Sequence, residues 1–161
     1  MASDKSASKS PAPLIHDGIH KNLIPFVEEE IPFHRMLGIR VLEVRPGHAR
    51  IRLPYNPGFQ GNVVRGAMHG GIIAVLVDIC GAVALWTNFG PTDKTSTLDM
   101  RVDYLRPAPF EELIAEGDVR MQGNRIANVD IRIYAASAPR RQLAEGRAVY
   151  YVKRVAGDGL A

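Results

Sequence analysis

The sequence predicts an α+β fold in which a curved antiparallel sheet wraps around one long central helix. The first observation behind this prediction is the stretch 69–86, which is apolar on every helical face except at Asp78. A helix without a polar face is normally buried on all sides. The second observation is that two strand-like segments precede this stretch and four follow it. Because one helix cannot cover both faces of a flat sheet, we expect the sheet to curve around it.

The composition is typical of a single globular domain. The chain has 161 residues, of which 46% are hydrophobic and 23% are charged. Its net charge of +3 suits an anionic small ligand, whereas nucleic-acid binding requires clustered basic residues, so we expect no nucleic-acid partner. The stretch 69–86 is short for a membrane span and carries a carboxylate in its middle, so we expect no membrane partner. No apolar leader segment opens the chain, which favours a cytoplasmic location.

The chain divides into three parts in this prediction. Residues 1–21 form a disordered tail, residues 22–154 form a single domain, and residues 155–161 form a short C-terminal tail. The disorder is predicted from residues 1–13, which are rich in Ser, Lys, Ala and Pro. Cys80 is the only cysteine, which excludes an intrachain disulfide.

A short helix, a hairpin and a loop are predicted before the long helix. Apolar residues within 16–30 recur with helical spacing, and Pro32 closes that segment. Segments 36–45 and 48–53 show strand-like alternation around a Pro-Gly turn, which predicts a β-hairpin. Residues 55–68 are rich in turn residues and predict a long loop. Long loops inside compact domains are often functional.

Four strands are predicted after the helix. In segment 97–104 the side chains alternate, with one face formed by Leu98, Met100, Val102 and Tyr104 and the other by Thr97, Asp99, Arg101 and Asp103. Segments 113–121 and 125–134 flank a Gly-Asn pair, which is a hairpin signal. Segment 142–154 presents one face made of Ala144, Gly146, Ala148, Tyr150 and Val152. The small residues on that face would let a helix approach closely.

The start of the long helix offers exposed backbone donors. Gly70 and Gly71 leave their N–H groups uncovered by side chains, and the first four N–H groups of a helix have no partner within it. These groups carry the positive end of the helix dipole. They can donate hydrogen bonds to a carbonyl oxygen that becomes negative during acyl transfer. The alternative interpretation is that the two glycines serve only tight packing or a turn.

Asp78 in the middle of the same helix needs an explanation of its own, since burying a carboxylate is costly. Its alternative role is a structural acid paired with a buried Arg. Asp78 follows His69 by nine residues, which places the two side chains on opposite faces and about 13 Å apart along the axis. They can share one reacting group if two copies of the helix lie antiparallel. The small residues near Asp78 would allow that approach: Gly71, Ala74, Gly81 and Ala82.

Several motifs occur in an order that resembles a known family. They are His69-Gly70-Gly71, Leu76-Val77-Asp78, Ser96-Thr97-Leu98-Asp99-Met100 and Tyr104-Leu105-Arg106-Pro107-Ala108. Over residues 33–153 the chain resembles the hotdog-fold thioesterase superfamily, in particular its phenylacetate-pathway and acyl-CoA thioesterase 13-like group. The resemblance implies the hotdog fold, in which a curved antiparallel sheet wraps around one long central helix.

The resemblance also implies roles for individual residues. The Gly70 amide would polarise the thioester carbonyl, and His69 would help to hold that carbonyl or order the site. Asp78 of a second subunit would act as general base or as nucleophile, while the Thr97 hydroxyl orients the attacking water. A loop amide completes the family pattern. Asn62 is the first candidate for it but stands one residue further from His69 than the pattern expects, and Gln60 is the second candidate.

Coenzyme A would be bound between subunits by polar groups near the surface. The resemblance favours Asn124 and Arg125, which follow the strand turn that approaches the nucleotide. Further candidate substrate contacts are Gly71, Gln60, Arg101 and Arg106. The alternative interpretation of each arginine is an ordinary charged side chain exposed to solvent.

The expected activity is hydrolysis of an acyl-CoA thioester to a free acid and coenzyme A. The expected assembly is a homodimer that pairs again into a homotetramer, with no cofactor and no metal. The alternative is a non-catalytic hotdog protein that binds acyl-CoA as a sensor or scaffold. A hotdog dehydratase or hydratase is disfavoured, because the arrangement of His and acid typical of those enzymes is not found here.

Overall fold

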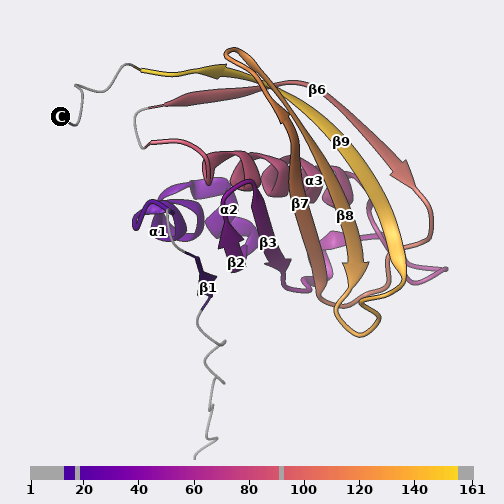
Figure 1. Cartoon of the computed structure of the whole chain (residues 1–161). Helices are drawn as coiled ribbons and strands as arrows, with labels where there is room; N and C mark the ends of the chain where they lie inside the picture. Colours follow the sequence, from indigo (N-terminus) through magenta and orange to yellow (C-terminus); the bar gives the residue numbers. More distant parts are fainter. Residues whose placement is uncertain (1–12, 17–18, 91–92, 156–161) are drawn as a thin grey trace, which may run out of the picture.

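The computed structural model describes residues 13–16, 19–90 and 93–155, and these residues form one curved sheet around one long helix (Figure 1). The sheet has seven strands in the order β1-β2-β3-β7-β8-β9-β6. Their bounds are β1 Leu14–Ile15, β2 Arg40–Arg45, β3 His48–Leu53, β6 Lys94–Tyr104, β7 Leu113–Gln122, β8 Ile126–Ala135 and β9 Gln142–Lys153. All neighbours are antiparallel except β1, which runs parallel to β2.

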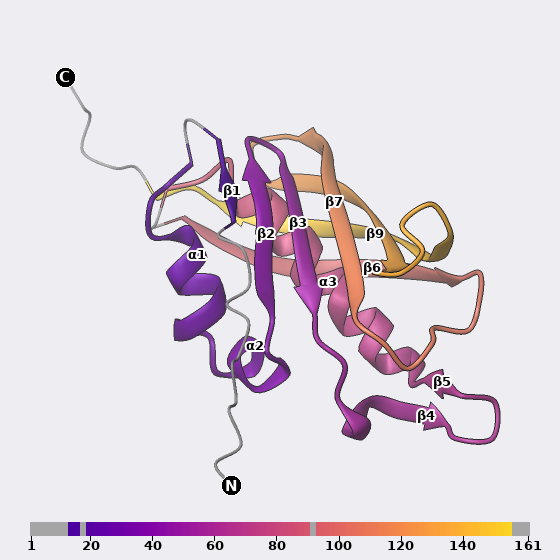
Figure 2. The ribbon, with the colours of Figure 1, turned by 90° about the horizontal axis from the view of Figure 1, so that it is seen from below.

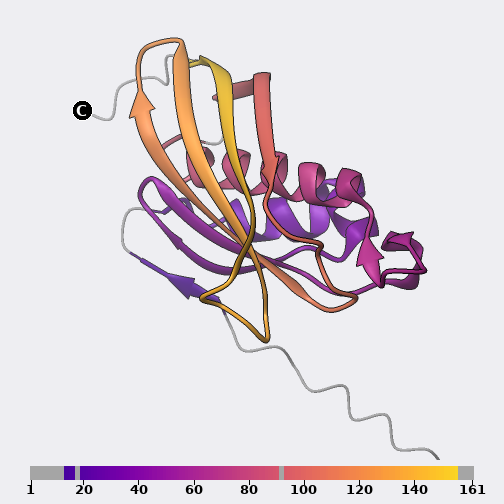
Figure 3. The same ribbon diagram turned by 90° about the vertical axis from the view of Figure 1, so that its right-hand side faces the viewer.

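The long helix α3, Gly70–Trp86, lies in the hollow of the sheet (Figure 3). Its buried side chains include Leu76, Val77 and Leu85, which are at most 1% exposed. The helix contacts β3, β7, β8, β9 and β6, so most of its circumference faces strands. This arrangement confirms the predicted hotdog fold and explains why the helix sequence has no polar face.

Two glycines let α3 and the sheet approach closely. A Cβ atom added at Gly146 of β9 would overlap the Val77 side chain, and one added at Gly81 of α3 would overlap the Tyr150 hydroxyl. The expectation that small residues on β9 admit the helix is therefore confirmed. Gly81 corrects another expectation, because its missing side chain makes room for β9 of the same chain and not for a second helix.

The segment before the sheet is more helical than the sequence pattern predicts. Helix α1 (Leu23–Pro25) continues into a π-helical turn (Phe26–Glu30), and helix α2 (Pro32–Leu37) follows. The first helical segment ends at Glu30, just before Pro32 as predicted, but Pro32 then begins a second helix that the pattern did not predict. The predicted first strand of the hairpin, 36–45, begins too early. Helix α2 occupies its first residues and ends at a glycine, Gly38, with a φ of 72°.

The predicted loop 55–68 contains structure of its own. A 3₁₀ turn, Pro57–Phe59, leads into a two-stranded hairpin made of β4 (Gln60–Asn62) and β5 (Ala67–Met68). Figure 2 shows this hairpin projecting past the start of α3. The strands are too short for alternation to reveal them, so the description as a loop of turn residues is corrected here.

Strand β6 contains a bulge that reverses the predicted facing of its first half. Thr97 pairs with Tyr150 and Asp99 with Val149, so Leu98 is the extra residue. Leu98 is 57% exposed. Beyond the bulge, Met100 and Val102 both pack against the core, which agrees with their predicted place on one common face. Before it, Thr97 also faces the helix, whereas the regular alternation assigned Thr97 to the other side.

The predicted tails are only partly covered by the structure. Within the predicted tail 1–21, residues 14–15 form β1 beside β2, and residues 1–12 and 17–18 lie outside the described residues. The same holds for residues 156–161 at the other end.

His34 on α2 is buried and titrates abnormally. It is 6% exposed, and its Nδ1 lies 3.0 Å from the Val27 carbonyl oxygen. Burial lowers the pKa of its imidazole, although the Val27 carbonyl and the charge of Asp78 oppose that shift. The neutral form is therefore preferred in the folded protein.

A pH-dependent loss of stability should follow from this histidine. Because the unfolded chain binds the proton more readily, His34 lowers the free energy of unfolding as the pH falls below its unfolded pKa of about 6.5 towards the lower folded value. We expect His34→Asn to flatten this dependence, since Asn can still donate to Val27 but does not titrate. Urea unfolding at pH 7 and pH 5 measures the slope. His16→Asn, at an exposed histidine, is the control, and equal flattening in both variants would contradict the assignment.

Candidate active site

The first part of the candidate site is the start of α3. His69 is the N-cap residue, and its Nδ1 accepts a hydrogen bond from the Gly71 N–H at 2.9 Å. Among the residues that the structure describes, no hydrogen bond uses the Gly70 N–H. The helix terminus therefore keeps one unpaired donor at Gly70, next to an exposed imidazole.

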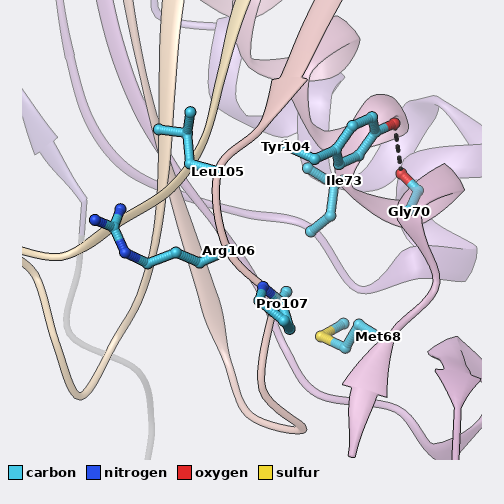
Figure 4. A pocket seen from close by; sticks show the side chains of 8 residues that line it. Met68, Gly70, Ile73, Tyr104, Leu105, Arg106 and Pro107 are labelled. Atoms are coloured by element: carbon cyan, nitrogen blue, oxygen red, sulfur yellow. Dashed lines mark hydrogen bonds between the residues drawn. The ribbon is translucent and has the colours of Figure 1, made fainter. Parts of the chain in front are cut away.

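A cavity of about 230 Å³ opens beside Gly70 (Figure 4). Its lining comprises Met68, Gly70, Ile73, Tyr104, Leu105, Arg106, Pro107 and Ala108. The Tyr104 hydroxyl donates to the Gly70 carbonyl oxygen at 3.1 Å. A Cβ at Gly70 would lie 3.3 Å from the Tyr104 ring, so the absence of a side chain lets the tyrosine cover this turn. Sequence reasoning assigned Tyr104 no role, because strand alternation alone does not show which residue of α3 it meets.

The second part is the carboxylate of Asp78. The Thr97 hydroxyl donates a hydrogen bond to Asp78 Oδ1 at 2.8 Å, and Asp78 is half-buried. Within the described part of the chain, no ion pair involves Asp78. The alternative role as partner of a buried Arg is thus not what the described residues show. The Asp78 carboxyl group therefore lies beside a hydroxyl and is partly exposed to solvent.

Tyr150 of β9 contacts the helix backbone at Asp78. Its hydroxyl donates to the backbone carbonyl oxygen of Asp78 at 3.0 Å. Burial, followed by the negative charge of Asp78, raises the pKa of Tyr150 far above its ordinary value, so the phenol stays protonated. The sequence pattern placed Tyr150 on the helix-facing side of β9 but indicated no contact with Asp78.

The two parts do not meet within one copy of the chain. Gly70 and Asp78 are eight residues apart on one helix, which is about 12 Å along its axis. Neither Asp78 nor Thr97 lines the cavity beside Gly70. The structure brings Asp78 to Thr97, and Gly70 to His69 and Tyr104, as two separate groups.

The two loop candidates make local hydrogen bonds. The Asn62 side chain accepts from the Arg65 N–H at 2.9 Å and so closes the turn between β4 and β5. The Gln60 side chain donates to the Tyr55 hydroxyl at 2.6 Å. The hairpin lies close against His69. A Cβ atom added at Gly61 would be only 2.6 Å from the His69 Cα, so the close approach depends on this glycine.

The candidate coenzyme A contacts fall at different ends of α3. Arg106 lines the cavity beside Gly70, and its guanidinium donates to the Gln142 carbonyl oxygen at 2.6 Å. Arg101 is 77% exposed and pairs with Asp103 at 2.9 Å.

The other two candidates, Asn124 and Arg125, are exposed in the turn between β7 and β8. The adjoining Gln122 accepts a hydrogen bond from Asn88, just beyond the C-terminal end of α3. The β7–β8 turn therefore lies at the end of the helix opposite Gly70.

Among the described residues, no cluster of three or more His, Cys, Asp or Glu side chains is arranged to hold a metal ion. No helix of the described chain has the length and apolarity needed to cross a membrane.

A sheet wrapped around one helix, with a His-Gly-Gly start and an acid in the middle of that helix, places the protein among the hotdog-fold proteins. The model of the thioesterase superfamily matches residues 65–139. A solved structure described as a member of that superfamily is 33% identical with a TM-score of 0.75, and the match covers 81% of this chain and 96% of that one. The chain belongs to the thioesterase superfamily.

Two further relatives carry names that indicate hydrolases. A Halobacterium salinarum protein, named provisionally as an esterase, is 31% identical over 125 residues, which cover 73% of this chain and 82% of that protein. The Escherichia coli medium/long-chain acyl-CoA thioesterase YigI is 27% identical over 117 residues, which cover 65% of this chain and 76% of that protein.

Proposed function

We propose that this protein hydrolyses an acyl-CoA thioester to the free acid and coenzyme A, at a site shared by two copies of the chain. The observation that carries this proposal is the half-buried Asp78 carboxylate, which is hydrogen-bonded to the Thr97 hydroxyl and has no basic partner among the described residues. A carboxylate held in this way can accept a proton from water. The acyl-CoA thioesterase YigI, 27% identical, supports the choice of substrate class.

The uncovered face of α3 supports a two-copy site. Gly71 is exposed, and Ala74, Val75, Asp78 and Ala82 are only partly buried, so one stripe of the helix is left open by the sheet. These residues are small or short, which lets a second helix approach. If the two helices run antiparallel along this stripe, Asp78 of each copy lies opposite the partner's Gly70.

The proposed reaction uses both parts of the site. Asp78 takes a proton from a water molecule oriented by Thr97, and the water oxygen forms a bond to the thioester carbonyl carbon. The carbonyl oxygen becomes negative and accepts a hydrogen bond from the N–H of the partner's Gly70 at a helix N-terminus. When the C–S bond breaks, the sulfur leaves as the thiolate of coenzyme A and the acid is released.

The same antiparallel arrangement brings the coenzyme A contacts together. Arg106 lies at the Gly70 end of one copy, and the β7–β8 turn lies at the other end of α3. In a pair, the partner's Arg125 would therefore approach the Gly70 end, where both guanidinium groups could bind the phosphates of coenzyme A.

Thiol release from a series of acyl-CoA esters tests this function. We expect turnover by the wild-type protein, and none by either Asp78→Ala or Gly70→Pro dimers alone. Mixed dimers of the two variants should regain up to about half of the wild-type activity, because one of their two sites has both an intact acid and an intact Gly70 amide. Mixing Asp78→Ala with Asp99→Asn, whose exposed carboxylate belongs to neither group, is the positive control for this recovery.

Two results would count against the proposal. Confirmed mixed dimers without any recovered activity would contradict the shared site. Tight binding of acyl-CoA by the wild-type protein, without thiol release from any ester, would favour the non-catalytic binding protein instead.

A further inference from the structure

A second, larger cavity of about 640 Å³ lies at the C-terminal end of α3. Its apolar lining is formed by Leu23, Phe26, Trp86 and Phe89. Trp86 is half-buried, stands edge-on to Phe26 with ring centroids 5.5 Å apart, and donates from its indole N–H to the Thr95 hydroxyl at 2.7 Å. The cavity therefore has one apolar wall with an aromatic pair, and polar residues form the rest of its lining.

This cavity reaches the neighbourhood of the proposed reacting carboxylate. Ser96 is part of its lining, and the next residue, Thr97, is bonded to Asp78. Trp86 follows Asp78 by eight residues on the same helix, which is about 12 Å along the axis. An acyl group whose carbonyl sits at Asp78 can therefore extend into the cavity towards Trp86.

The projecting hairpin β4–β5 ends in an apolar tip. Val63 and Val64 in its turn are 70% and 93% exposed, and Arg65 follows them. Exposed valines at the end of a projecting hairpin are costly to hydrate and are typical of a surface that another molecule covers. Figure 2 shows that this hairpin extends beyond the start of α3.

The length of the hairpin matches the position of the cavity in an antiparallel pair. Gln60 and Val64 are four positions apart, which corresponds to at most about 13 Å along a strand. When Asp78 lies opposite the partner's Gly70, the partner's hairpin points along α3 towards Trp86, about 12 Å away. The cavity lining carries two carboxylates, Glu30 and Asp93, and one lysine, Lys94, so its carboxylates outnumber its lysine, whereas the hairpin tip carries an arginine.

We propose that the partner's Val63 and Val64 close the cavity at Trp86 and thereby complete an acyl pocket built from two copies of the chain. This inference rests on the antiparallel pairing in the proposed function. The pocket holds acyl groups of medium length or with an aromatic ring, because these reach from Asp78 to Trp86. Acetyl groups end before the cavity and make no contact with the partner's hairpin.

Trp86 reports on this closure, since it is the only tryptophan of the chain. We expect Val64→Asp to raise the acrylamide quenching constant of the Trp86 fluorescence about twofold, because the charged tip leaves the apolar cavity. It should also lower kcat/KM for octanoyl-CoA about tenfold or more, and leave acetyl-CoA within about twofold. Leu14→Asp, which adds the same charge at an exposed leucine of β1, should change neither quantity.

A cross-linking experiment keeps the inference testable if Val64→Asp disturbs assembly. The double variant Val64→Cys with Glu30→Cys should give covalent dimers with a short bis-maleimide, while Val64→Cys with Leu14→Cys should not. The buried Cys80 does not interfere. Absence of covalent dimers from a protein that light scattering shows to be dimeric would overturn the closure.

The outcomes separate this inference from the proposed function. Unchanged Trp86 quenching in a dimeric, catalytically active Val64→Asp protein would overturn the closure and leave the thioesterase function standing. A wild-type protein that releases no thiol, but whose Val64→Asp variant exposes Trp86, would retain the closure and lose the function. A wild-type protein that is monomeric at assay concentrations would contradict both.

Discussion

Asp78→Asn is expected to lower kcat/KM for thioester hydrolysis by about 10²–10⁴-fold, the range that a general base contributes. The amide has the shape of the carboxylate and can still accept the hydrogen bond of Thr97, which now lies 2.8 Å from Oδ1. It cannot accept a proton from water. Folding and assembly should therefore be retained while turnover is lost. Thiol release measures the activity, and circular dichroism and light scattering check the fold and the dimer.

The matched control for this variant is Asp99→Asn. Asp99 is an exposed carboxylate on β6, just beyond the bulge that separates it from Thr97. The change removes the same charge from the same region without touching the Thr97–Asp78 pair. We expect activity within about twofold of wild type, as for most surface substitutions. Equal losses in both variants, or full activity of Asp78→Asn, would refute the role of Asp78 as the base.

Gly146→Ala is expected to lower the free energy of unfolding by about 1–3 kcal/mol, the usual effect of overpacking a core. A methyl group at this position overlaps the Val77 side chain, which is fully buried in α3. Either the helix moves away from β9 or Val77 adopts a strained rotamer. Urea unfolding, followed by far-UV circular dichroism, measures the loss.

Two controls separate overpacking from the general effect of replacing a glycine. Gly90→Ala adds a methyl group whose nearest neighbour is a carboxylate oxygen 4.0 Å away, so we expect little change. The double variant Gly146→Ala with Val77→Ala should be more stable than the sum of the two single losses predicts, because the smaller helix residue makes the space. Simple additivity of the two losses would show that the Gly146–Val77 contact is not the cause.

The fold was predictable because its main elements have long, regular patterns. An apolar stretch with a single charge predicted the central helix over 69–86, and the structure places α3 at Gly70–Trp86. The short elements could not be found in this way. The bulge at Leu98 is one extra residue within an otherwise regular strand, and it turns Thr97 towards the helix although the alternation points Thr97 away. Nothing in the spacing of side chains distinguishes a bulged strand from a regular one.

The candidate site was predictable where it depends on positions within one helix. The separation of His69 and Asp78 along the axis followed from helix geometry alone and led directly to two half-sites. Contacts between distant segments did not follow. The hydrogen bond of Tyr104 to Gly70 and the location of Arg125 at the far end of α3 depend on strand order and curvature, which one-dimensional patterns do not contain.

The burial of Cys80 has a chemical consequence for the proposed hydrolysis of thioesters. Cys80 is fully buried in α3, and burial, followed by the charges of Glu116 and Asp118, raises the pKa of its thiol. An exposed, ionised thiol would undergo transthioesterification with an acyl-CoA, which would leave the protein acylated on sulfur. It would also attack the disulfide form of coenzyme A, which forms a mixed disulfide and releases one coenzyme A thiolate. The only cysteine of the chain is protected from both side reactions by the same packing that buries the helix.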